Sequence, residues 1–217
     1  MGEVELSPAA REAISKALSP EICEQPLVPV PGGLTNACYR LGPTGPLVKL
    51  YGAGTDLLTD RDRERALIAH LSAVAPGTCK QLLVLFEGGH VEEWVEGSTV
   101  PFNQMVEPYG EQICGLIGSL HSTVLPQGVC VVQAEDTFWT DMHSWAEALP
   151  SSCEPSPIVL KEALVELRDL AVQSPVCICH RDIHGANLLL TPTGELRLID
   201  FEFGCAAPRG EWQLLLM

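Results

Sequence analysis

One stretch of the chain decides the fold: His180-Arg181-Asp182-Ile183-His184-Gly185-Ala186-Asn187, followed after a short interval by Ile199-Asp200-Phe201. It sets out an aspartate, an asparagine and a second aspartate in that order. Phosphoryl transfer from ATP needs one carboxylate to accept a hydroxyl proton, and an Asn and an Asp to hold magnesium against the phosphates. This residue set predicts Asp182 as the base and Asn187 and Asp200 as magnesium ligands.

The spacing of these residues also predicts that they meet. Residues 176–179 have the pattern of a short strand that ends just before Asp182. Residues 187–190 and 196–199 have the pattern of a hairpin around a Thr-Pro-Thr-Gly turn, which would return Asp200 to the same place. Two other interpretations are open: an Asp that caps a turn, and a His-x-Asp-x-His metal site of a hydrolase. Both leave Asn187 and the Asp200-Phe201 pair unexplained.

Composition narrows the classes of partner. The 217 residues are 46% hydrophobic and have a net charge of -15, which indicates a globular protein and argues against binding to nucleic acid or anionic membranes. A small cationic substrate is compatible with this charge. No apolar run is long enough to span a membrane, and the N-terminus lacks the basic and apolar regions of a signal peptide. We therefore expect a cytoplasmic protein.

The nine cysteines form no CxxC pair. An odd number without a secretory signal favours reduced, partly buried thiols over a disulfide framework, and we expect these thiols not to bind metal. Cys177 and Cys179 alternate along the predicted strand, so their side chains share one of its faces.

Periodicity divides the chain into a sheet-rich part and a helical part. In the first part we expect a helix over residues 6–18, a proline-rich break at 26–33, and a second helix over 59–74 that begins with a capping box at Thr59 and Asp62. We expect strands over residues 37–41, 46–51, 81–86 and 90–95. The second part is expected to contain helices over 105–121 and 156–173, with a less periodic stretch between them that holds Trp139 and Trp145. This order predicts two lobes with a cleft between them: a nucleotide-binding lobe over residues 1–97 and part of a catalytic lobe over residues 98–217.

The first lobe contains residues suited to phosphate. Gly32 and Gly33 begin a turn, continued by Thr35 and Asn36, whose backbone N–H groups can approach an anion, although a Gly-Gly turn is more often only a turn. Lys49 alternates with apolar neighbours, so it either faces solvent on its strand or is buried and needs an anionic partner, and the downstream Asp182 set favours the second. Phosphate and Glu64, in the following helix, are both possible partners.

Two further features are less specific. Residues 93–97 run from a strand into a glycine-containing connector. They either offer backbone groups to adenine, with Trp94 or Val95 lining the slot, or form an ordinary connection between the lobes. Trp139 and Trp145 could line a pocket for an ammonium group, but packing in the core or between the lobes is favoured.

The chain resembles the choline/ethanolamine kinase family. The resemblance extends from about Gly32 to Phe203 and is carried by GGLTN at 32–36, LVKLYG at 47–52, TDLLTDRDRE at 55–64, EWVEG at 93–97, FWTDM at 138–142, HRD at 180–182 and IDFEF at 199–203. The block from Lys49 to Glu64 is the most specific of these segments and resembles the ethanolamine kinases more than the choline kinases.

This resemblance implies an α+β, protein-kinase-like two-lobe fold, with a small antiparallel-sheet N-lobe and a helical C-lobe. It implies transfer of the ATP γ-phosphate to ethanolamine, or alternatively to choline, with Mg2+ as cofactor, on the route to phosphatidylethanolamine. By resemblance, Asp182 is the base, Asn187 and Asp200 hold Mg2+, and the remaining residues bind ATP: Gly32, Gly33, Thr35, Asn36, Lys49, Glu64, Glu93 and Val95.

The family continues past the IDFE segment with a helical region that shapes the amino-alcohol pocket. Here only Arg209-Gly210 resembles its beginning before the sequence ends at Met217. The resemblance therefore implies an incomplete C-lobe, and a kinase-like protein that binds without catalysing is a further alternative. The sequence leaves the oligomeric state open.

Overall fold

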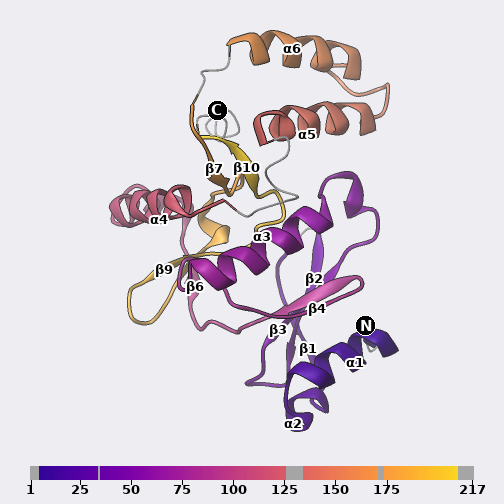
Figure 1. The fold of residues 1–217 in the computed structure, drawn as a ribbon, viewed down its shortest axis with the longest axis vertical. Coiled ribbons are helices and arrows are strands. Elements are labelled where there is room, and N and C mark those ends of the chain that lie inside the picture. The colour runs from indigo at the N-terminus through magenta and orange to yellow at the C-terminus, as the bar shows by residue number, and fades with distance from the viewer. Residues whose placement is uncertain (1–4, 34, 126–133, 171–173, 210–217) are drawn as a thin grey trace.

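A five-stranded antiparallel sheet forms the N-terminal part of the computed structural model, which describes residues 5–33, 35–125, 134–170 and 174–209 (Figure 1). Its strands lie in the order β1-β2-β3-β5-β4. Their bounds are Leu27–Val30 for β1, Asn36–Leu41 for β2, Leu47–Tyr51 for β3, Leu82–Phe86 for β4 and Gly89–Glu92 for β5. Lys49 therefore lies on a strand with a neighbour on each side, paired with Cys38 of β2 and His90 of β5.

One face of this sheet is covered by α1 (Pro8–Ala17), which is followed by the short α2 (Pro20–Cys23). The Ser7 hydroxyl caps α1 by accepting a hydrogen bond from the Ala10 N–H at 3.2 Å, and Pro8 suits the first turn. Ile14 is fully buried and belongs to the same core cluster as Val48 of β3 and Val91 of β5. This core anchors the strand that carries Lys49.

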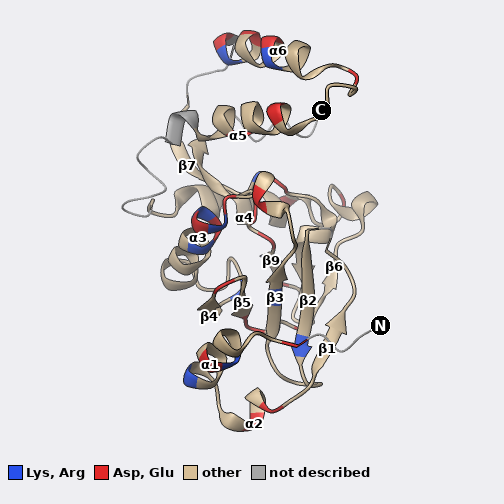
Figure 2. Ribbon diagram, turned by 90° about the vertical axis from the view of Figure 1, so that its right-hand side faces the viewer, with Lys and Arg blue, Asp and Glu red and all other residues tan. Residues whose placement is uncertain are grey.

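Helix α3 (Arg61–Val74) follows a short 3-10 helix, η1 (Thr55–Leu57), and joins the two parts of the fold. Its apolar stripe of Leu67, Ile68 and Leu71 is buried in the core of the C-terminal part, together with Leu120 and Ile178. Both basic and acidic residues lie on α3 (Figure 2). The helix therefore carries charged side chains while its other face fixes it to the C-terminal core.

The C-terminal part combines helices with two small sheets. Its helices are α4 (Gly110–Ser122), α5 (Ala134–Ala148) and α6 (Pro157–Leu170), with 3-10 helices η2 (Phe102–Gln104) and η3 (Gly185–Asn187). Strand β7 (Val176–Cys179) pairs with β10 (Cys205–Pro208), and β8 (Leu188–Leu190) lies between β6 (Ser98–Thr99) and β9 (Leu196–Leu198). All of these pairings are antiparallel. None of the helices in the described ranges is both long enough and apolar enough to cross a lipid bilayer.

Most of the predicted elements are present, including β7 with the predicted bounds and the β8–β9 hairpin. The predicted capping box is wrong, because the Asp60 carboxylate, and not Thr59, accepts the N–H groups of Asp62 and Arg63 at 3.1 and 3.0 Å. The strand predicted over 90–95 ends at Glu92. The helix predicted from residue 105 begins at Gly110.

Several elements were not predicted, among them α2, β6 and the 3-10 helices as well as β1, α5 and β10. Strand β1 forms in the proline-rich break because it lies at the edge of the sheet, where Pro29 is tolerated. Helix α5 occupies the stretch that had appeared irregular, and Trp139 is buried on it, in accord with the packing role. Strand β10 is too short to have a clear period. Residues 171–173 of the last predicted helix, and the sequence after Arg209, lie outside the described residues.

Candidate active site

Strands β7 and β9 lead into the two segments that carry Asp182 and Asp200. The HRD segment directly follows β7, and Asp200 follows β9. Arg181 and Asp200 both have a φ of 66°, in the left-handed region that side chains other than glycine rarely adopt. Such conformations cost on the order of 1–3 kcal/mol each and persist where the surrounding contacts hold them. The backbone is therefore strained at both Arg181 and Asp200.

His180 holds the two strained segments together. Its buried ring lies against Phe201, with 4.5 Å between ring centroids. The Nε2 atom lies 2.9 Å from the Ile199 carbonyl oxygen, and the Asp182 backbone N–H donates to Nδ1 at 3.3 Å. Both bonds are satisfied by a neutral imidazole with its proton on Nε2. Burial lowers the pKa of His180, which favours this neutral form.

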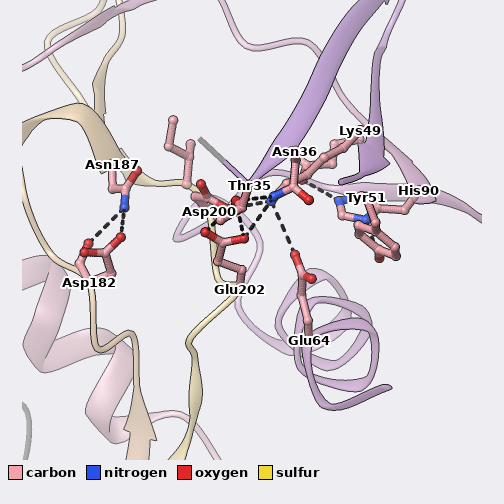
Figure 3. A network of polar contacts seen from close by, with 12 residues as sticks. Thr35, Asn36, Lys49, Tyr51, Glu64, His90, Asp182, Asn187, Asp200 and Glu202 are labelled. Atoms are coloured by element: carbon pink, nitrogen blue, oxygen red, sulfur yellow. Dashed lines mark hydrogen bonds and ion pairs between the residues drawn. The ribbon is translucent and has the colours of Figure 1, made fainter. Parts of the chain in front are cut away.

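Asp182 and Asn187 form a direct pair (Figure 3). The Asn187 side-chain NH2 group donates to Asp182 Oδ2 at 2.8 Å and to the Asp182 carbonyl oxygen at 3.0 Å. His184 Nε2 lies 3.4 Å from the same Oδ2 atom. Because Asn187 uses its NH2 group as a donor, its side-chain oxygen is left to face another ligand. The Asp182 side chain is about one-third exposed, with a relative accessibility of 34%, so solvent or a substrate hydroxyl can reach it.

Lys49 joins the sheet to both α3 and the end of β9. Its ammonium group lies 2.5 Å from Asp200 Oδ1 and 3.3 Å from Glu64 Oε1, and all but 6% of its side chain is buried. Burial alone would lower the pKa of Lys49, but the carboxylates of Asp200 and Glu64 outweigh burial and raise it. Lys49 is therefore a fixed positive charge, and the predicted pairing with Glu64 is present.

Arg61 and Glu202 extend this network and were not predicted as site residues. Arg61 Nη1 lies 2.7 Å from Glu64 Oε2 and 3.6 Å from Glu202 Oε2. Thr35 and Asn36 both donate to Glu202, at 2.7 and 2.9 Å. The side chains of Thr35 and Asn36 are thus directed to Glu202, while the Thr35 carbonyl oxygen accepts the Gly52 N–H at 3.0 Å and Asn36 is paired with Tyr51 of β3.

The signal for this network was present in the sequence as charge on the buried side of α3. From the sequence, no partner was predicted for Arg61 or Arg63, and the one predicted for Glu64 was Lys49. All three are buried, with at most 9% of each residue exposed. Buried charges need partners, so Glu202 in the IDFE segment could have been proposed as one.

A second buried network fixes the HRD loop to α3 and α5. Arg63 donates through both terminal nitrogens to Asp141, at 3.1 and 2.9 Å, and Arg181 Nη1 lies 2.6 Å from the same carboxylate. The Arg181 guanidinium also lies 5.0 Å from the ring centroid of Phe138. Asp141 therefore neutralises two buried cations and joins three parts of the chain that are far apart in sequence.

The predicted glycine turn adopts the backbone that glycine permits. Gly32 and Gly33 have φ values of 113° and 84°. A Cβ atom on Gly33 would lie 2.8 Å from the Asn36 carbonyl oxygen, so a larger residue would force the turn to shift. Leu34 lies outside the described residues. Thr35 and Asn36 follow directly at the start of β2.

Glu93 and Val95 lie in the irregular connection between β5 and β6. The Glu93 N–H donates to the Gln81 carbonyl oxygen at 2.9 Å, and its carboxylate accepts from Arg197 at 2.9 Å. These bonds hold the connection in place and use the Glu93 N–H, so its carbonyl group is the part of this residue that can meet a ligand.

The arrangement places a carboxylate suited to general-base chemistry next to side chains of the types that hold an anion or a metal ion. In Figure 3, Asp200 lies between the Asp182–Asn187 pair on one side and Glu64 on the other. The structure thus brings together Asp182, Asn187, Asp200, Lys49 and Glu64 and connects them to Thr35 and Asn36. Glu93 and Val95 remain apart from these contacts, in the connection after β5.

The model of the choline/ethanolamine kinase family matches residues 27–211 of this sequence. The chain belongs to this family. The match includes every residue of the site described above, from the glycine turn to Glu202. A comparison with the sequences of curated proteins gave no match.

Solved structures support the same fold. An ethanolamine kinase from Plasmodium vivax is similar with a TM-score of 0.71 and 21% identity, over 92% of this chain and 62% of its own length. A choline kinase from Streptococcus pneumoniae has a TM-score of 0.63 and 22% identity, over 90% of this chain and 68% of its own. An ADP-bound aminoglycoside phosphotransferase has a TM-score of 0.56 and 15% identity, over 87% of this chain and 72% of its own.

The protein-kinase-like α+β fold is therefore confirmed, with an antiparallel N-terminal sheet and a helical C-terminal part. The chain spans about 62% of the length of the ethanolamine kinase that it matches. Members of this fold with three different acceptors share the architecture, so the fold alone does not choose among acceptors. The boundary at residue 97 stays a prediction.

Proposed function

We propose that the protein transfers the γ-phosphate of ATP to the hydroxyl group of ethanolamine and forms phosphoethanolamine. The observation that carries the proposal is the assembly, in a chain of the choline/ethanolamine kinase family, of the Asp182–Asn187 pair next to the Lys49–Glu64–Asp200 network. The sequence block from Lys49 to Glu64, which resembles the ethanolamine kinases, favours ethanolamine over choline. The chain spans about 62% of the length of the Plasmodium vivax ethanolamine kinase, so catalytic activity of this chain is itself part of the proposal.

Asp182 is the proposed base. Asn187 donates to its Oδ2 atom at 2.8 Å, which restricts the orientation of the carboxylate and leaves Oδ1 outside this bond, where it could accept the proton of an acceptor hydroxyl. Proton transfer to a positioned carboxylate typically contributes 10²–10⁴-fold to a rate. Asn187 would thus have two roles: its NH2 group orients the carboxylate of the base, and its oxygen binds the metal ion.

The residues present fit a magnesium ion. Asn187 and Asp200 offer oxygen atoms, the donors that Mg2+ prefers, and each keeps an oxygen outside the hydrogen bonds described above. Bound there, Mg2+ would neutralise charge on the phosphates. Lys49, held by Glu64, would grip a phosphate group, and the glycine turn at 32–33 would present backbone N–H groups to the phosphates.

The remaining nucleotide contacts are proposed for the connection between β5 and β6. The Glu93 carbonyl and the Val95 backbone would meet adenine, because the Glu93 N–H is already used by Gln81. An S. pneumoniae choline kinase of similar fold has been solved in complex with AMP, which supports a nucleotide as the ligand of this site. The boundary between a nucleotide-binding lobe and a catalytic lobe would then lie near residue 97.

A competition experiment tests the acceptor. The protein would be incubated with magnesium, labelled ATP and equal concentrations of ethanolamine and choline, and the phosphorylated products separated. Phosphoethanolamine as the main product is the expected result. Phosphocholine as the main product would assign the choline alternative, and binding of nucleotide without either product from folded protein would support the non-catalytic alternative.

A further inference from the structure

The most distinctive side-chain cluster outside the active site lies between α4 and β7. His121, on the last turn of α4, and Cys177 and Cys179 of β7 place one nitrogen and two sulfur atoms within 4.8 Å of one another. Both cysteines are buried, and His121 is half-buried. The cleft chemistry proposed above uses none of these three side chains. We infer that this cluster is a zinc-binding site.

The geometry of the two sulfur atoms fits a shared tetrahedral ion. Cys177 Sγ and Cys179 Sγ lie 3.7 Å apart. Two thiolates at a Zn–S distance of about 2.3 Å and a tetrahedral angle lie about 3.8 Å from each other. Two packed thiols can have a similar separation, so the sulfur atoms alone decide nothing. The imidazole of His121, brought to the same point by a different element, is the observation that favours a metal.

The chemistry of the ligands selects zinc. Thiolate and imidazole ligands together in a tetrahedral arrangement are typical of Zn2+, whereas magnesium and calcium prefer oxygen. Two thiolates and a neutral imidazole balance the two positive charges of the ion, which a buried site requires. Three protein ligands leave a fourth position for solvent, and the half-buried His121 marks the side from which solvent reaches the site.

A third cysteine lies near the cluster but is not part of it. Cys205 lies opposite Cys179 in the β7–β10 pairing but bonds to Arg181 at 3.4 Å, outside the group of three. The sequence had favoured plain thiols because the nine cysteines form no CxxC pair and come without a secretory signal.

The site would brace the segment that leads to the base. Cys179 is the last residue of β7, and the HRD segment begins at the next position. An ion held by His121, Cys177 and Cys179 would join the end of α4 to this strand. We therefore expect zinc to raise the thermal unfolding midpoint of the whole chain.

Cobalt is the spectroscopic probe for the test. The full chain, freed of metal and reduced, would be titrated with Co2+, which replaces zinc and gives a thiolate-to-cobalt charge-transfer band together with visible bands of tetrahedral intensity. The expected result is one equivalent of cobalt bound with this band, and displacement of the band by Zn2+. Absence of the charge-transfer band at stoichiometric cobalt in the wild-type chain would overturn the inference.

Two matched variants locate the ion. His121→Ala removes a half-buried ligand and is expected to weaken cobalt binding about tenfold or more, whereas His143→Ala, at another half-buried helical histidine, leaves the affinity unchanged. Asp200→Ala removes a proposed magnesium ligand in the cleft and is expected to keep the band. Unchanged affinity in His121→Ala, or loss of the band in Asp200→Ala, would contradict a site at α4 and β7. Neither result depends on whether the chain phosphorylates an amino alcohol.

Discussion

Replacing Glu64 by Gln tests the buried charge network that holds Lys49. The Glu64 side chain is 1% exposed and lies 3.3 Å from the Lys49 ammonium and 2.7 Å from the Arg61 guanidinium. Gln has nearly the same shape, but it has no charge, and its NH2 group would face one of these two donors. The variant therefore leaves two buried cations with one anion fewer and creates no cavity.

The size of the effect follows from the partners that remain. Removing one partner of a buried ion pair typically costs about 3–5 kcal/mol. Lys49 keeps Asp200 at 2.5 Å, and Arg61 keeps Glu202 at 3.6 Å. We therefore expect a loss at the lower end, about 3 kcal/mol of unfolding free energy. For a chain of this length, such a loss lowers the thermal midpoint by roughly 6–12 °C.

The assay is urea unfolding followed by circular dichroism, with Glu12→Gln as the matched control. Glu12 forms an ion pair with Lys16 at 2.6 Å, but both side chains are mostly exposed, at 66% and 72%, and water screens the pair. We expect no measurable change in the control. A Glu64→Gln variant as stable as Glu12→Gln would refute the view that this network is a buried brace. If the proposed function holds, Glu64→Gln also lowers kcat/KM for ATP.

Two further predictions concern the HRD loop. Burial lowers the pKa of His180 in the folded chain, so the unfolded chain binds a proton at this residue more readily. The free energy of unfolding therefore falls as the pH drops below the unfolded pKa of about 6.5. In His180→Gln, which keeps a donor toward Ile199, the free energy of unfolding measured from pH 7.5 to 5 should fall less steeply, and an equally steep fall would contradict the assignment. Asp141→Asn leaves Arg63 and Arg181 buried with a neutral partner and should cost about 3–5 kcal/mol in urea unfolding, whereas a loss below about 1 kcal/mol would show that the two arginines do not depend on Asp141.

The sequence predicted the parts of the site that local spacing controls. Asp182 and Asn187 lie five residues apart on one loop, and the hairpin that returns Asp200 has a clear turn signal, so both could be inferred without a structure. The pairing of Lys49 with Glu64 could be inferred for a different reason: a lysine flanked by apolar strand residues needs a buried anion. In each case one physical requirement, the geometry of a short turn or the pairing of a buried charge, restricts which residues can become neighbours.

The parts that were missed depend on contacts between distant segments. Glu202 receives hydrogen bonds from Thr35 and Asn36, and Asp141 joins Arg63 to Arg181, but no local pattern indicates which charged residues become neighbours. The same holds for β1 and β10, whose short strands are stabilised by the partners beside them and not by their own periodicity. Helix α5 was missed because the stretch that contains it, between Pro126 and Pro155, has a less regular pattern of apolar residues than the predicted helices on either side.

The central claim is that this chain moves phosphate with Asp182 as the base. It is tested most directly by phosphorus NMR of a reaction containing the chain, magnesium, ATP and ethanolamine, run in parallel with Asp182→Asn. The account predicts a phosphoethanolamine signal with the wild type, and its loss in Asp182→Asn while nucleotide binding, measured by calorimetry, is retained. Nucleotide-bound, folded wild-type chain that forms no phosphorylated amino alcohol, or an Asp182→Asn variant as active as the wild type, would contradict it.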